Sequence, residues 1–93
     1  MKATWKGTIL ADSDDTVMVE NNHYFPMNSL KKEFFLDSST TSHCPWKGEA
    51  NYFTISVGDE KNRDAAWYYL NPKEKAQNIK GRVAFWKGVD IIS

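Results

Sequence analysis

The chain has 93 residues with twelve basic and twelve acidic side chains, which predicts one small domain (residues 1–93) without net charge. This balance excludes the basic face that nucleic-acid binding requires, and no apolar run or basic amphipathic helix indicates membrane contact. No export signal is visible, so a cytoplasmic location is expected. Aromatic residues make up 14% of the chain, more than a minimal core requires.

The first quarter of the chain predicts an antiparallel meander. An extended run over residues 2–11 precedes a turn cluster at Asp12–Asp15, and an alternating strand follows over residues 16–20. A second turn at Asn21–Asn22 leads into a short strand that Pro26 ends. Two hairpins are therefore expected in this part of the chain.

The middle of the chain predicts strands separated by polar segments. A single helical turn is expected over residues 30–33, a brief apolar strand over 34–36 and a Ser/Thr loop over 37–42. Glu49–Val57 is the clearest strand, because its apolar residues alternate with polar ones. Residues 65–70 predict another strand, with aromatic side chains on both faces.

The last quarter predicts one helix and a closing hairpin. Asn71 and Pro72 suit a helix start and Gly81 suits a helix end. The sequence then predicts two strands, over residues 83–86 and 89–92, joined by a Lys-Gly turn. The expected fold is mainly β, a small antiparallel barrel or two-sheet sandwich with one or two short helices.

The stretch His43–Ala50 concentrates site-like residues, including the single cysteine of the chain. Pro45 favours extended backbone at Cys44, and Gly48 can adopt a positive φ. The stretch therefore predicts a shaped loop that presents a thiol, an indole and the ammonium of Lys47 from one place.

Cys44 is the candidate catalytic residue, as nucleophile or redox thiol. A neighbouring cation such as Lys47 or His43 would lower the pKa of the thiol. The alternative is a small apolar residue packed beneath the loop. No base or oxyanion donor can be assigned from the sequence, so both interpretations stay open.

Metal and cofactor binding are not predicted. One cysteine excludes an internal disulfide, and His23 and His43 lack the spacing of metal ligands. The pair Asp12 and Asp14 resembles a magnesium-binding pair, but it falls in an expected turn where aspartate bonds the backbone.

Trp-Lys-Gly occurs three times, starting at Trp5, Trp46 and Trp86. The interval of about forty residues suits a repeat, but the flanking residues differ. We interpret the three copies as turns at strand ends, each placing an indole beside a flexible glycine.

The aromatic residues are the strongest remaining functional signal. Tryptophans near strand ends line pockets that hold planar or cationic ligands, although a plain aromatic core would use the same residues. A mixture is expected, with one or two indoles facing a cleft that also contains a cation. The predicted ligand-binding residues are Tyr24, Trp46, Lys47, Trp67, Tyr69, Arg82 and Trp86.

Several segments together resemble a known bacterial family, the domain of unknown function 427, sometimes labelled nucleotidyltransferase-like. The segments are Asp14–Val17, Asn22–Pro26, Cys44–Ala50, Ala65–Tyr69 and Gly81–Trp86. The resemblance implies a small β-rich domain of the β-tent type, a group with zinc-bearing members and an aromatic-cage binder of cyclic imides and uridine-like rings. The chain lacks the paired cysteines of the former and the Gly-Ser and paired-aspartate signature of nucleotidyltransferases.

Three functional hypotheses follow. The first is a domain that binds a small planar or anionic ligand in an aromatic cleft with Lys47 and Arg82. The second is an enzyme that uses Cys44. The third is an interaction module with an exposed aromatic patch, and the chain is expected to be a monomer or a homodimer.

Overall fold

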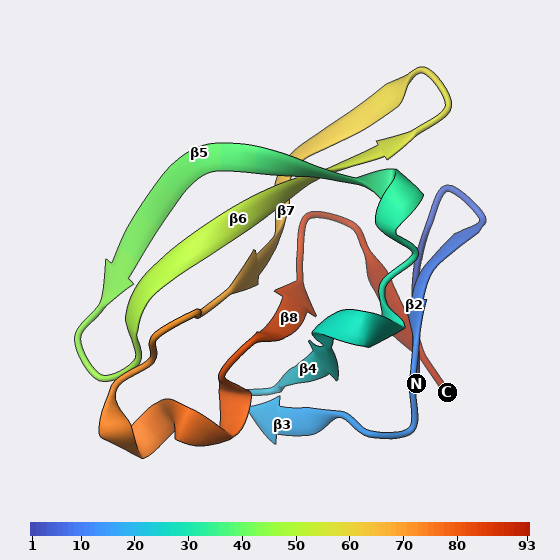
Figure 1. The fold of residues 1–93 in the computed structure, drawn as a ribbon. Helices are drawn as coiled ribbons and strands as arrows, with labels where there is room; N and C mark the ends of the chain where they lie inside the picture. The colour runs from blue at the N-terminus through green and yellow to red at the C-terminus, as the bar shows by residue number, and fades with distance from the viewer.

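Nine strands form two antiparallel sheets in the computed structural model, which describes residues 1–93 (Figure 1). The smaller sheet has the order β2-β1-β9, with bounds β1 (Lys2–Trp5), β2 (Thr8–Asp12) and β9 (Asp90–Ile92). The larger sheet has the order β3-β4-β8-β7-β6-β5. Its strands are β3 (Val17–Val19), β4 (Asn22–Pro26), β5 (Phe35–Cys44), β6 (Gly48–Val57), β7 (Glu60–Tyr68) and β8 (Arg82–Phe85). The predicted mainly β, two-sheet architecture is confirmed.

The two faces of the larger sheet pack against different partners. One face meets the smaller sheet, and the core between them includes Leu10 from β2 with Phe25 and Val83 from the larger sheet. Side chains alternate along a strand, so the residues next to these point the other way. Tyr24 and Ala84 accordingly belong to a second buried cluster on the outer face.

All helical segments are 3₁₀ helices: η1 (Met27–Ser29), η2 (Lys32–Phe34) and η3 (Glu74–Ile79). The expectation of a regular helix between Asn71 and Gly81 was wrong. The buried residues of η3 are Ala76 and Ile79, three positions apart, which matches the repeat of a 3₁₀ helix. Ala76 itself has non-helical backbone angles, so η3 is two short turns that cover the second cluster.

The first predicted hairpin was placed wrongly, and the second is confirmed. β1 and β2 are joined at Lys6 and Gly7, whose φ values of 53° and 74° are both positive, as in a type I′ turn. The Asp12–Asp15 cluster instead carries the chain from one sheet to the other. β3 and β4 do form a hairpin, and its turn contains the left-handed residues Glu20 and Asn21.

The predicted closing hairpin was also wrong. β8 pairs with β4 and β7, whereas β9 pairs with β1 in the smaller sheet. A turn does form, because the Val89 amide donates to the Trp86 carbonyl. After this turn β9 joins the smaller sheet, whereas β8 belongs to the larger one. Both sheets contribute apolar side chains to the core between them.

The predicted Ser/Thr loop over residues 37–42 is part of β5, a ten-residue strand at the edge of the larger sheet (Figure 1). β5 pairs with β6 and is interrupted by an irregularity between Asp37 and Thr41. Threonine is a good strand former, and an edge strand needs few apolar residues. No helix in the structure has the length and apolar character to span a membrane.

Candidate ligand pocket

The outer face of the larger sheet contains a hollow of about 190 Å³. Five residues line it: Lys47, Tyr52, Trp67, Tyr69 and Trp86. Four of them belong to the set predicted from the sequence. The fifth, Tyr52, is the residue that the sequence argument omitted, although alternation along β6 places it on the outer face with Ala50.

Strand register brings the aromatic walls together. Tyr52 on β6 lies opposite Trp67 on β7, and Trp67 lies opposite Ala84 on β8. Ala84 has a small side chain, so space remains between the larger neighbours. Trp86 lies two residues beyond Ala84, and its amide donates to the Ala65 carbonyl of β7.

Trp67 is fixed by contacts with its aromatic neighbours. Its ring meets Trp86 edge to face at 6.0 Å and Tyr24 edge to face at 6.2 Å. Its indole nitrogen donates to the Tyr24 hydroxyl over 3.2 Å. Tyr24 is fully buried, so it supports a wall of the hollow and does not line it.

Trp86 is held by Asp64, a residue that the sequence analysis did not identify. The indole nitrogen of Trp86 donates to the Asp64 carbonyl over 2.6 Å. The Asp64 carboxylate accepts hydrogen bonds from Ser38 and Thr40 on β5, and these lower the pKa of Asp64. Asp64 has a positive φ of 55°, a backbone feature with no clear signal in the sequence.

Lys47 supplies the only buried charge in the structure, with a residue exposure of 6%. Its ammonium lies 5.3 Å from the ring centre of Trp46 and 5.9 Å from that of Tyr69. It forms an ion pair with Glu20 from the β3–β4 turn. Burial alone would lower the pKa of Lys47, but the hydrogen bond with Glu20 and other nearby groups outweigh this and raise it. The same hydrogen bond lowers the pKa of Glu20.

The turn that carries Lys47 is tied to the segment before η3. The Lys73 amide donates to the Lys47 carbonyl over 2.8 Å, and the Lys73 ammonium donates to the Pro45 carbonyl over 2.7 Å. Gly48 has a φ of 108°, which confirms the expected positive value. Trp46 lies in this turn, is 39% exposed and does not line the hollow.

Cys44 lies at the end of β5, opposite Gly48. It is half-buried and packs against the second buried cluster. The ammonium of Lys47 is engaged by Glu20, and the side chain of His43 is exposed. Catalysis by Cys44 stays a prediction.

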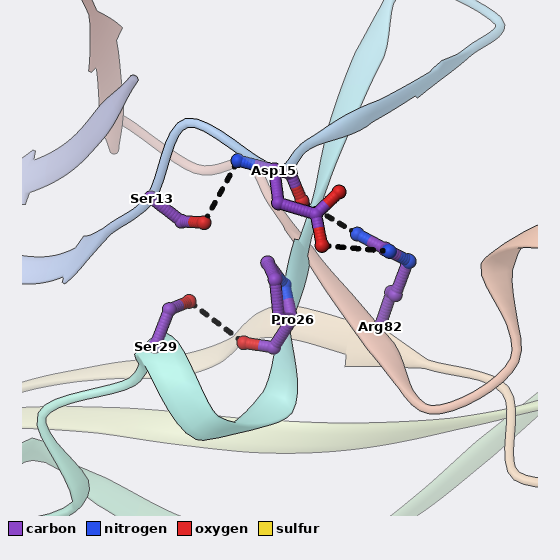
Figure 2. A network of polar contacts seen from close by, with 5 residues as sticks. All are labelled: Ser13, Asp15, Pro26, Ser29 and Arg82. Carbon is purple, nitrogen blue, oxygen red and sulfur yellow. Dashed lines mark hydrogen bonds and ion pairs between the residues drawn. The ribbon is translucent and has the colours of Figure 1, made fainter.

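Arg82 does not line the hollow. Figure 2 shows its guanidinium beside Asp15. Its guanidinium donates to the backbone carbonyl of Asp15 over 2.6 Å and to the Asp15 carboxylate over 3.3 Å. Arg82 begins β8 beside Pro26, whereas Trp86 follows the end of β8, so about 13 Å of extended strand separates their backbones. Arg82 instead borders a separate polar depression with Met27 and Lys80.

A family model described as "Domain of unknown function (DUF427)" matches residues 1–93. The chain belongs to the DUF427 family. The match covers both sheets, and the short name of the DUF427 model carries a nucleotidyltransferase label. Comparison with curated proteins gives no significant match. In this DUF427 domain no three His, Cys, Asp or Glu side chains gather closely enough to share a metal ion.

Proposed function

We propose that this domain binds a small planar metabolite of the cytoplasm in the aromatic hollow, with Lys47 neutralising a negative charge on the ligand. The observation that carries this proposal is that four aromatic side chains and the buried Lys47 line the same hollow, with the Lys47 ammonium 5.9 Å from the ring centre of Tyr69. Such a combination of apolar walls and one oriented polar group is typical of small-molecule sites.

The size of the hollow sets the size of the ligand. Its volume of about 190 Å³ is below the range of about 300–1,000 Å³ that is common for drug-sized ligands. An engineered cavity of about 150 Å³ holds benzene. A ligand with one ring or two small fused rings therefore fits best.

The walls present aromatic surface more than hydrogen-bond donors. The indole nitrogen of Trp67 is bonded to Tyr24, and that of Trp86 is bonded to the Asp64 carbonyl. The Tyr52 hydroxyl shares a hydrogen bond with Ser42 over 2.8 Å. Stacking and edge-to-face contact are therefore the main sources of affinity for the ring.

Calorimetric titration with a panel of one-ring and fused-ring heteroaromatic compounds tests this proposal. Trp86→Ala removes one wall and should weaken binding about tenfold or more, because stacking of a planar base on an aromatic side chain contributes about 1–3 kcal/mol. Trp5→Ala is the matched control, since Trp5 lies on β1 and packs against the core between the sheets.

The control variant should bind as the unchanged chain does. Equal losses in the two variants, or no binding of any panel compound, would contradict the proposal. Calorimetry is preferred to fluorescence here because each substitution also removes a fluorophore.

A further inference from the structure

We propose that Glu20 is an internal competitor for Lys47, and that the hollow selects small aromatic monocarboxylates that displace it. This inference rests on the proposed function and specifies the ligand class. It follows from the Lys47–Glu20 ion pair, from the position of Glu20 in the fold and from the donors that remain free in the hollow.

The two partners of the ion pair differ in exposure. The Lys47 side chain is 8% exposed, whereas the Glu20 side chain is 55% exposed. A buried ammonium without a partner is costly, because it has lost most of its hydration. A carboxylate that is already half in water returns to solvent at little cost. The exchangeable partner is therefore Glu20, provided that another anion takes its place on Lys47.

The position of Glu20 allows this exchange without a change of fold. Glu20 lies in the tight turn between β3 and β4, and its backbone carbonyl accepts a hydrogen bond from the Asn22 side chain over 3.4 Å. Its carboxylate has one ion-pair partner, Lys47, and a weaker side-chain contact with Trp46, which is itself exposed. Rotation of one side chain is enough to release the ammonium, while the turn and both strands stay in place.

The remaining donors favour a carboxylate over a phosphate. Phosphate groups are usually bound by several donors, such as clustered backbone amides or arginine forks. The hollow offers a single cation, and both of its indole nitrogens are already bonded. Arg82, which could supply a fork, is bonded to Asp15 elsewhere. One positive charge beside ring faces matches one carboxylate on one aromatic ring.

Matched acids and amides test the inference. Benzoate with benzamide, and nicotinate with nicotinamide, differ in charge but little in shape. Calorimetry at pH 7 would compare the unchanged chain with Glu20→Gln and with Glu33→Gln, a control that removes an exposed carboxylate of η2. Glu20→Gln should raise the affinity for the acids about tenfold and leave the amides unchanged, because only the acids compete for Lys47. Glu33→Gln should change neither.

Two results would overturn the inference. If the amides bind all three chains and Glu20→Gln leaves the ratio of acid to amide affinity unchanged, displacement is wrong while the proposed function stands. If no compound binds any chain, both fail.

A second variant gives a readout that does not depend on a titration. Glu20→Gly suits the φ of 53° at this position, so the turn is preserved while Lys47 loses its partner. Sodium benzoate, compared with sodium chloride at equal ionic strength, should raise the Tm of this variant by more than it raises that of the unchanged chain. An equal shift in both would contradict the displacement.

Discussion

At the scale of single residues, the hollow places a buried ammonium and a buried phenol side by side. Tyr69 is 4% exposed, and its ring lies 5.9 Å from the ammonium of Lys47. Burial raises the pKa of Tyr69 to about 12, although the positive charge of Lys47 acts in the opposite direction. The pKa of Lys47 is raised as well. Both groups therefore keep their protons to higher pH in the folded chain than in the unfolded chain.

This leads to a prediction for alkaline solution. The stability due to a raised pKa is complete below the unfolded value, about 10 for tyrosine, and is lost as the pH rises towards the folded value. Tyr69 should therefore reduce the free energy of unfolding by about 1 kcal/mol between pH 9 and pH 11. Urea unfolding of Tyr69→Phe should show a smaller loss over this interval. The same loss in the variant and in the unchanged chain would show that Tyr69 titrates normally.

At the scale of elements, left-handed turn residues decide where strands end. The turn between β1 and β2 and the turn after β8 each contain a lysine and a glycine with positive φ. In each, the ammonium lies over the preceding indole, at 5.6 Å for Lys6 and 5.1 Å for Lys87. These Trp-Lys-Gly copies are strand-end turns, as the sequence indicates, but one closes a hairpin and the other links two sheets.

Gly7 tests the backbone requirement without interference from packing. A methyl group at Gly7 would meet no atom within 4 Å, and the φ of 74° is left-handed. Gly7→Ala should therefore lower the free energy of unfolding by about 1 kcal/mol through backbone strain alone. Gly7→Asn is the matched control, because asparagine tolerates this conformation better, and it should cost clearly less. If urea unfolding gave the same loss of free energy for Gly7→Ala and Gly7→Asn, the positive φ would not be the cause.

The sequence predicts the regular elements better than the way they connect. Glu49–Val57 alternates apolar and polar residues, and the structure has β6 over Gly48–Val57. The start of β5 falls in the predicted strand over residues 34–36, but the rest of β5 is missed because its polar residues resemble a loop. Only the pairing with β6 shows that these residues form a strand. β8 and β9 lie in different sheets because β8 pairs with β7 and β9 pairs with β1. The residues of the turn between β8 and β9 carry no information about these distant partners.

The residues in and around the hollow also divide into those that the sequence predicts and those that it does not. Trp67, Tyr69 and Trp86 could be selected because aromatic residues near strand ends are unusual enough to notice. Glu20 and Asp64 could not, because each acts through a partner more than twenty positions away in the chain. Arg82 was grouped with the hollow by its charge, whereas its place at the start of β8 directs it to Asp15.

At the scale of the whole molecule, the two ends of the chain meet in the smaller sheet. Lys2 is paired with Ile92 across β1 and β9, and Figure 1 shows the two termini side by side. A short flexible linker can therefore join them without disturbing either sheet.

Cyclisation should raise the stability of the fold. Joining the ends restricts the unfolded chain, and loop-closure arguments for a loop of this length give a gain of about 4–5 kcal/mol. Urea unfolding would compare the cyclic chain with a linear chain that carries the same linker. An unchanged free energy of unfolding would mean that the ends are not free to be joined in the native geometry.

The pairing of β1 with β9 also determines the order in which the protein can be completed during synthesis. β1 is the central strand of the smaller sheet, yet one of its edges has no partner until the last strand has been translated. The hairpin of β1 and β2 is local, but the smaller sheet is complete only once β9 has been made, and such distant pairing typically slows folding to milliseconds or seconds. The edge of β1 that pairs with β9 is therefore exposed in the nascent chain until β9 has been made.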